Sequence, residues 1–505
     1  MEVQSIDRPF LLRTAILSLL LLWPLLVFGQ PSYFPDSASY QHGGKIAVDF
    51  AAKKLHLWEP TPTAKPASAP DAQSPAASSP AVAGKAATGG HEDLKVARSI
   101  LYSVMGYVMG GPGTSMIFLG IFQAICLAIV STALYGAITG PAYPGFELTA
   151  VILALFTTAA PVSWFIVPDI YAGLLIAVTV VIGFYGHRCS WALLLLLLGI
   201  AILSVAVHSS HPPIALAMAG VGGLWMLFME RPASRERWLR IGLLFSPFVL
   251  GVVLTILTGI IGFGEVSVAP KRYPLALARA INNGPAYWYL QKHCKKPEFA
   301  VCEVYRGQPI PREVRDFLWG PGGVILKATP EQMDRIRAEE NTIILRSTME
   351  HPWVQINKII VDVPRQMRSF KVNGMRFDST ISVPDGREAR VISKKNMPNH
   401  PIMTAVDMIS TIIVLISTIA LALWLRGMSV KQRGIFVTLF FGLLANAAIC
   451  AIFSGVTHRY QARVIWVVPL FALALVYSDG RWRQVRALWH RRRTATVPGA
   501  DSTFG

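Results

Sequence analysis

The sequence has few charged residues for its length. Only 15% of its 505 residues are charged, whereas 53% are hydrophobic. An ordinary soluble domain has ~25% charged residues. Several hydrophobic runs reach the ~20 residues that are needed to cross a hydrocarbon core of ~30 Å. The shortage of charge excludes an ordinary soluble domain, and the long runs predict an integral membrane protein.

Nucleic-acid motifs are also lacking, although the net charge is +18. The arginines gather in short segments between hydrophobic runs and in the tail 481–493. Such positions suit anionic lipid head groups and membrane topology, and no aromatic-basic groove accompanies them. We therefore expect membrane lipids as partners, and no nucleic acid.

Ten hydrophobic runs predict an all-α polytopic membrane protein with about ten transmembrane helices. The runs cover approximately 10–28, 115–139, 147–160, 169–186, 190–207, 213–229, 241–263, 403–425, 434–455 and 464–478. The run at 147–160 is short. No clean small-residue cleavage site follows the first run, so we read it as a retained helix and not as a signal peptide.

Basic residues predict the orientation of these helices. With the amino terminus inside, sixteen basic residues fall in short cytoplasmic segments, and only Arg459 and Arg463 fall in short segments on the other side. The positive-inside rule favours this arrangement. It predicts a multi-pass protein of the bacterial inner membrane, with both termini cytoplasmic and the large loops periplasmic.

The expected organisation alternates membrane segments with long outer segments. The predicted units are a first transmembrane helix at 1–29, a first outer loop at 30–113 with a disordered Ala/Pro-rich insert at 60–90, helices two to seven at 114–263, a small α or α+β outer domain at 264–401, helices eight to ten at 402–478, and a basic cytoplasmic tail at 479–505. The insert has no aromatic residue and cannot bury enough apolar surface to order itself. Helical spacing also predicts a helix along the membrane surface at 92–109 and another at 330–350 in the outer domain.

Two cysteines of the outer domain predict a disulfide. Cys294 and Cys302 lie eight positions apart, and an oxidising compartment favours a bridge between them over two unrelated thiols. The other three cysteines lie in or beside hydrophobic runs, where a thiol acts as a small apolar residue.

Polar residues gather beside the outer ends of the predicted helices. They are Asp36, Asp169, His208, His211, His458, Arg459 and Arg463. Ionisable groups near the hydrocarbon boundary are costly and are kept where a partner or a function offsets the cost. Arginine is disfavoured on this face, so the two arginines predict a bound anion or acidic partner, and a guanidinium fork suits phosphate oxygens.

Each of these residues also has a purely structural interpretation. Asp36 could cap a short helix, and for Asp169 we favour a helix cap over a catalytic role. The arginines could form structural ion pairs with either aspartate. His208 and His211 could bind a divalent metal together with a carboxylate, but two histidines three positions apart in a loop are weak support, and no metal or other cofactor is assigned.

The segment Pro35-Asp36-Ser37-Ala38-Ser39-Tyr40 and the pair Arg459-Tyr460, followed by Pro469, resemble motifs of GT-C type membrane glycosyltransferases. These enzymes use lipid-phosphate sugars and place an acidic residue just after their first helix. Landmarks at 168–169, 208–211, 294–302 and 458–463 are also similar to those of a narrower group of bacterial membrane proteins, which implies no particular chemistry.

The resemblance implies transfer of a sugar from a polyprenyl-phosphate donor to an envelope glycan, lipid or protein acceptor. Asp36 would then be the general base, and Asp169 a supporting or alternate carboxylate. Arg459, Arg463 and Lys45 would bind the donor phosphate. Further candidate site residues are Tyr40, His208, His211, His458 and Tyr460.

Other functions stay open at this point. A transporter or flippase of a lipid-linked or anionic substrate is one alternative, because Pro24, Pro247 and Pro469 could break membrane helices. A ligase of lipid-linked glycans would use the same arginines. A non-enzymatic polysaccharide-assembly protein would depend on 264–401 more than on Asp36 or Arg459.

Overall fold

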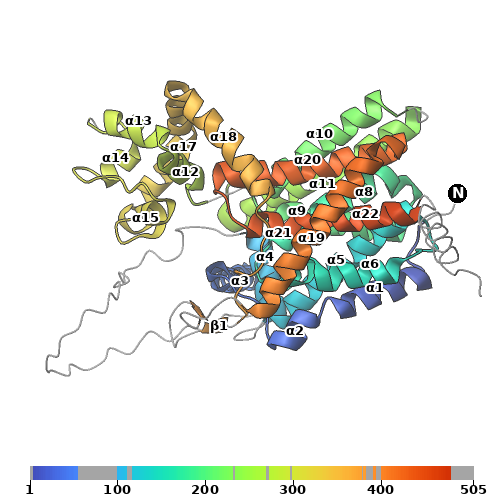
Figure 1. Ribbon diagram of the computed structural model, residues 1–505. Coiled ribbons are helices and arrows are strands. Elements are labelled where there is room, and N and C mark those ends of the chain that lie inside the picture. Colours follow the sequence, from blue (N-terminus) through green and yellow to red (C-terminus); the bar gives the residue numbers. More distant parts are fainter. Residues whose placement is uncertain are drawn as a thin grey trace, which may run out of the picture.

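The computed structural model describes residues 4–54, 99–110, 116–230, 234–268, 272–295, 298–377, 379–382, 390–393 and 400–478. Within these ranges the chain is almost entirely helical (Figure 1). The predicted disordered insert at 60–90 and the basic tail at 479–505 lie outside the described residues.

Eight helices of the described chain are long and apolar enough to cross a membrane. They are the broken pair α1 (Arg8–Leu20) and α2 (Trp23–Phe28), α5 (Ile117–Thr139), α8 (Ile170–Tyr185), α10 (His211–Phe228), α11 (Ser234–Phe263), α19 (Pro401–Trp424), α20 (Val430–Phe453), and the broken pair α21 (Arg459–Ile465) and α22 (Val467–Ser478). Each corresponds to one of the predicted hydrophobic runs. The membrane character of the chain is therefore supported by the structure.

Two of the ten predicted runs form shorter helices. The run at 147–160 gives α6 (Phe146–Phe156), which has 11 residues, and the run at 190–207 gives α9 (Trp191–Ala206), which has 16. At ~1.5 Å per residue they span ~17 Å and ~24 Å, less than the ~30 Å of a hydrocarbon core. After α6 the chain bends at Thr157 and forms the short helix α7 (Ala159–Ser163). The structure thus supports eight long spans, and the predicted count of about ten stays a prediction.

Helix α8 lies at the centre of the bundle. Every residue from Ile170 to Phe184 is buried, as expected for a helix that is hydrophobic all round. It contacts α5, α9, α10, α11, α20 and α21. Close approach to α21 depends on Gly173, because a Cβ atom added there would lie 2.5 Å from the carbonyl oxygen of Arg463.

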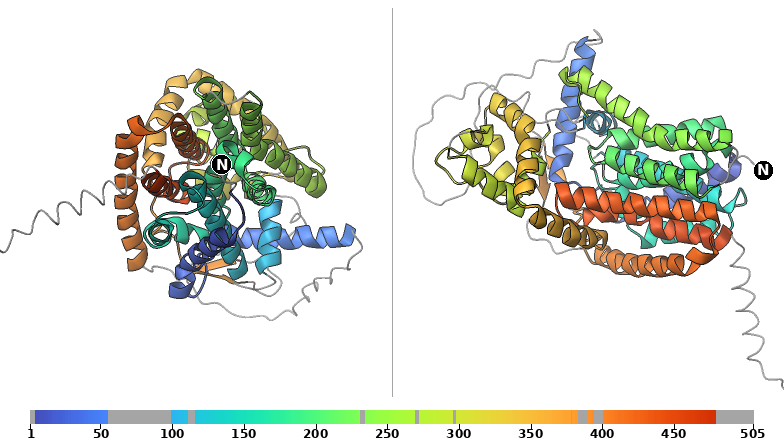
Figure 2. Two further views of the ribbon diagram at one scale, coloured as in Figure 1. Left: turned by 90° about the vertical axis from the view of Figure 1, so that its right-hand side faces the viewer. Right: turned by 90° about the horizontal axis from the view of Figure 1, so that it is seen from above.

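Helix α3 (Pro35–Lys54) crosses one end of the bundle, roughly perpendicular to the long helices (Figure 2). Helix α4 (Ile100–Gly110), which was predicted to lie along the membrane surface, packs against α3. The contact is tight, since a Cβ atom added at Gly44 would lie 2.0 Å from the carbonyl oxygen of Ser103.

A separate helical domain lies at the same end of the bundle (Figures 1 and 2). It consists of α12 (Leu275–Asn283), α13 (Pro285–His293), α14 (Ala300–Val304), α15 (Val314–Trp319), α16 (Val324–Lys327) and α17 (Pro330–Glu350), with a hydrophobic core of its own. The helix predicted at 330–350 is confirmed, and Thr329 begins it with a capping box. Whether this domain lies outside the cytoplasm stays a prediction.

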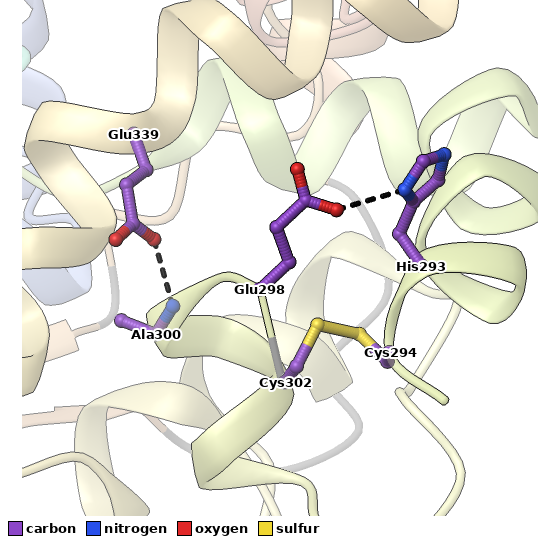
Figure 3. Close-up of a disulfide and its surroundings, with 6 residues drawn as sticks. All are labelled: His293, Cys294, Glu298, Ala300, Cys302 and Glu339. Carbon is purple, nitrogen blue, oxygen red and sulfur yellow. Dashed lines mark hydrogen bonds and ion pairs between the residues drawn. A yellow bond between two sulfur atoms is a disulfide. The ribbon is translucent and has the colours of Figure 1, made fainter. Parts of the chain in front are cut away.

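The predicted disulfide is present in this domain. Cys294 and Cys302 are joined, with their Cα atoms 5.0 Å apart (Figure 3). The bridge lies between the end of α13 and the short helix α14. Two carboxylates hold the same turn, since His293 pairs with Glu298 at 2.9 Å and the backbone N–H of Ala300 donates to Glu339 at 2.7 Å.

Helix α18 (Pro352–Met367) connects the helical domain to the bundle and packs against α20. Near its end, the Gln366 amide exchanges hydrogen bonds with the backbone of Thr457, at 2.9 Å and 2.8 Å. After α18, Asp407 of α19 accepts hydrogen bonds from the backbone N–H groups of Val372 and Asn373. A short antiparallel hairpin, β1 (Ser379–Ser382) and β2 (Arg390–Ser393), precedes α19. The loop before α21 is thereby attached to α18, and the segment after α18 is attached to α19.

Candidate functional site

A buried ion pair joins the start of α8 to α21. The carboxylate of Asp169 accepts a hydrogen bond of 2.8 Å from Nη1 of Arg463, and their side chains are 5% and 0% exposed. The predicted helix cap is wrong, because Asp169 precedes α8 without a hydrogen bond from its side chain to the helix backbone. The attraction of the buried guanidinium outweighs the weaker capping interaction.

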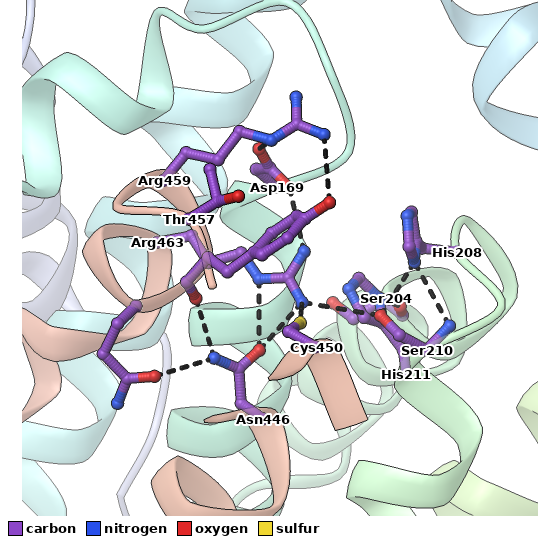
Figure 4. A network of polar contacts seen from close by, with 12 residues as sticks. Asp169, Ser204, His208, Ser210, His211, Asn446, Cys450, Thr457, Arg459 and Arg463 are labelled. Atoms are coloured by element: carbon purple, nitrogen blue, oxygen red, sulfur yellow. Dashed lines mark hydrogen bonds and ion pairs between the residues drawn. The ribbon is translucent and has the colours of Figure 1, made fainter. Parts of the chain in front are cut away.

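The remaining donors of Arg463 also have partners inside the protein (Figure 4). Nε and Nη2 both donate to the amide oxygen of Asn446, at 3.1 Å and 2.8 Å. Nη2 also lies 3.4 Å from the Ser210 hydroxyl and 3.3 Å from the Cys450 sulfur. A buried charge is tolerated when it is paired and its hydrogen bonds are satisfied. Arg463 therefore holds helices together and presents no surface to a ligand.

Asn446 connects this pair to the backbone of α21. Its Nδ2 donates to the carbonyl oxygen of Tyr460 at 2.7 Å and to the side chain of Gln461 at 3.1 Å. Asn446 was not among the predicted site residues. It could have been found as the amide side chain in the otherwise apolar stretch from Leu443 to Cys450, because an unsatisfied polar group in a membrane helix is costly.

Arg459, one turn before Arg463, is placed differently. Its side chain is 23% exposed, and its Nε lies 4.0 Å from the second carboxylate oxygen of Asp169. That oxygen is buried and has no hydrogen-bond partner among the described residues. The guanidinium carbon of Arg459 lies 4.2 Å from the ring centre of Phe34, a cation–π contact. Of the two arginines, only Arg459 can reach a ligand.

Asp36 lies at the same end of the bundle, half-buried in the first turn of α3. It is close enough to Arg459 for electrostatic attraction. The start of α3 is fixed by Ser37, whose hydroxyl donates to the carbonyl oxygen of Ile166 at 2.6 Å. Backbone hydrogen bonds of 2.9 Å between Ser32 and residues 164 and 166 complete the attachment. Asp169 and the two arginines therefore lie together, and Asp36 lies within electrostatic range of Arg459.

Tyr40 and Lys45 follow Asp36 on α3 but have different surroundings. Tyr40 is buried and meets the ring of Tyr102 edge-on, with ring centres 4.8 Å apart. Lys45 is exposed, and it follows Asp36 by nine residues, or ~13.5 Å along the helix. The role of Lys45 in binding a phosphate stays a prediction.

His208 precedes α10 and His211 is its first residue. Their ring centres lie 5.1 Å apart, and His211 lies near Arg463. His211 is buried, and its Nδ1 lies 2.5 Å from the carbonyl oxygen of Ser204. A carbonyl oxygen can only accept, so the proton is on Nδ1. Nδ1 of His208 accepts from the backbone N–H of Ser210. No group of three His, Cys, Asp or Glu that could hold a metal is present in the part of the chain that the structure describes.

His458 and Tyr460 flank Arg459 on α21. The Tyr460 hydroxyl accepts a hydrogen bond of 3.5 Å from Arg459, and its ring also faces Arg463. His458 is exposed. Partial burial and the nearby charge of Lys371 lower the pKa of His458 below its ordinary value, and Asp407 opposes this shift. His458 therefore belongs to the rim of the site and not to the buried network.

The site thus consists of a buried ion pair, Asp169 and Arg463, and of two less buried groups, Asp36 and Arg459. The ion pair and Asn446 hold three helices together, and Asp36 lies within electrostatic range of Arg459. No protein-family model matches the chain, and no curated protein matches its sequence.

Proposed function

We propose that this protein is a membrane glycosyltransferase that moves a sugar from a polyprenyl-phosphate donor to an envelope glycan, lipid or protein acceptor on the outer face of the membrane. The observation that supports this most directly is that half-buried Asp36 lies within electrostatic range of partly exposed Arg459. Both lie at the end of a bundle of eight apolar helices, where a lipid tail can lie beside the helices while its phosphate stays at the surface.

In the proposed reaction, Arg459 binds the donor phosphate and stabilises its negative charge as it leaves. Asp36 accepts the proton of an acceptor hydroxyl, whose oxygen forms the new glycosidic bond. The bond between the sugar and the phosphate oxygen breaks, and polyprenyl phosphate departs with the electron pair. Arg463 and Asp169 take no part in bond making; they hold α21 so that Arg459 lies beside Asp36.

Asp36→Asn tests the proposal, with Asp49→Asn on the same helix as the matched control. The asparagine keeps the shape of the side chain but cannot accept the proton, so transfer should fall at least ~100-fold. The assay measures release of polyprenyl phosphate from a panel of polyprenyl-phosphate sugars by the purified protein in lipid. Asp49→Asn should keep full activity. Full activity in Asp36→Asn would remove Asp36 from the mechanism.

A transporter or flippase is the second candidate, and the broken helices favour it. The chain breaks between α6 and α7 and again between α21 and α22. The two breaks are joined, because the Thr158 hydroxyl donates to the carbonyl oxygen of Ala462 at 2.7 Å. Discontinuous helices beside a buried ion pair are typical of transporters. Movement of a polyprenyl-phosphate sugar across proteoliposomes without covalent change would support transport, whereas release of polyprenyl phosphate would support transfer.

A further inference from the structure

A second cluster of charges lies at the opposite end of the bundle. Asp169 precedes α8, and Arg188 follows it in the 3₁₀ turn η1 (Gly186–Arg188). Their separation of 19 positions corresponds to ~28 Å of helix. Arg188, Arg240 of α11, Glu230 and Glu236 lie within electrostatic range of Lys431 of α20. The cluster therefore joins three helices at the end that is remote from the proposed transfer site.

Arg240 is the buried centre of this cluster. Its side chain is 4% exposed, and its Nη1 donates to Glu230 at 2.5 Å. Its Nε and Nη2 are buried and have no hydrogen-bond partner among the described residues. A buried donor without an acceptor destabilises the folded protein, and more so when it is charged. Oε1 of Glu230 is likewise buried without a partner, so a single hydrogen bond to this carboxylate leaves two donors of Arg240 unsatisfied among the described residues.

The surrounding charges are also unbalanced. Three cations, Arg188, Arg240 and Lys431, face only two carboxylates. Glu236 is 40% exposed, so its charge is partly screened by solvent. Lys431 is half-buried, with Nζ 3.5 Å from the ring centre of Tyr185. Cations held together in this way attract an anion.

We infer that this cluster binds a phosphate group. Three cations from three helices, together with unpaired guanidinium N–H donors, match the several oxygens of a phosphate. Basic clusters between membrane helices bind anionic lipid head groups, and each Lys or Arg contributes ~1 kcal/mol. The bound phosphate would join η1, α11 and α20. The site is independent of the proposed transfer reaction.

The test uses the full-length protein in an uncharged detergent, and it measures thermal stability and ligand affinity. Phosphatidylglycerol should raise the melting temperature, whereas phosphatidylcholine should not. Lys431→Gln and Arg188→Gln should each weaken the apparent affinity for phosphatidylglycerol about fivefold. Arg426→Gln removes an exposed cation near the start of α20 and should keep the affinity of the unmodified protein.

Inorganic phosphate distinguishes the source of the ligand. Stabilisation by inorganic phosphate at matched ionic strength would identify a free phosphate as sufficient, and stabilisation by phosphatidylglycerol alone would identify a lipid head group. Each variant is compared with its own ligand-free melting temperature, so a change in basal stability does not affect the measured shift on ligand binding. Equal stabilisation by phosphatidylcholine, an unchanged affinity in both cluster variants, an equal loss in Arg426→Gln, or no response to either phosphate source would overturn the inference.

Discussion

The two ends of the helix bundle each contain a buried arginine paired with a carboxylate, but the pairs differ in their hydrogen bonds. Arg463 finds Asp169, Asn446, Ser210 and Cys450 around it. Arg240 donates through Nη1 alone, to Glu230, and leaves Nε and Nη2 without partners in the described chain. Arg463, with all its donors satisfied, has a structural role. Arg240, with two unsatisfied donors, is the residue for which we infer a role in binding an anion.

The same contrast exists within the proposed transfer site. Arg459 and Arg463 lie one turn apart on α21, and both face Asp169. Arg463 is fully buried, whereas Arg459 keeps 23% of its side-chain surface exposed. Exposure, and not the presence of a guanidinium, decides which of the two is available to a phosphate.

The largest expected effect comes from breaking the satisfied pair. Asp169→Asn leaves Arg463 buried without its counter-charge and should destabilise the folded protein by about 3–5 kcal/mol. With phosphatidylglycerol present, Glu230→Gln should cost less, because a bound phosphate would supply the negative charge that Arg240 loses. Thermal unfolding of both variants in the same detergent measures the difference. A loss in Glu230→Gln as large as that in Asp169→Asn would contradict the distinction between the two ends.

A smaller effect is expected from Gly173→Ala. The new methyl group would lie 2.5 Å from the carbonyl oxygen of Arg463, so α21 must move away from α8, at a cost of about 1–3 kcal/mol. Gly220→Ala is the control, because no described atom lies within 4 Å of a Cβ atom added there. It should leave stability unchanged or raise it slightly, since alanine favours helix. Equal melting temperatures for the two variants would show that α8 and α21 are not tightly fitted.

The smallest effect concerns pH and separates the rim from the buried network. The pKa of His458 is lowered in the folded protein, so below pH ~6.5 the unfolded chain binds a proton that the folded chain does not. Stability should therefore fall slightly as pH drops from ~6.5 toward the lowered pKa. His458→Gln should flatten the pH dependence of the melting temperature in this window. An unchanged slope in the variant would assign the pH dependence to other groups.

Local features of the sequence were sufficient to predict much of the fold. Span length and hydropathy located all eight long helices, because crossing a membrane is a requirement on consecutive residues. Helical spacing predicted α17 from Pro330 onward, because this spacing is also a property of nearby residues in the chain. The runs at 147–160 and 190–207 form helices shorter than the runs themselves, because hydropathy does not show where a helix ends. Helix α6 stops at Phe156 although apolar residues continue beyond it.

The site was predictable only as a set of residues at one end of the bundle. The sequence by itself determined that Asp36, Asp169, Arg459 and Arg463 follow or precede apolar helices on a common face. Tertiary structure alone decided that Arg463 is buried, that Asp169 forms an ion pair with it instead of capping α8, and that Arg459 stays partly exposed. These roles depend on Asn446 and Gly173 from other helices, and contacts between distant segments exist only once the helices have packed.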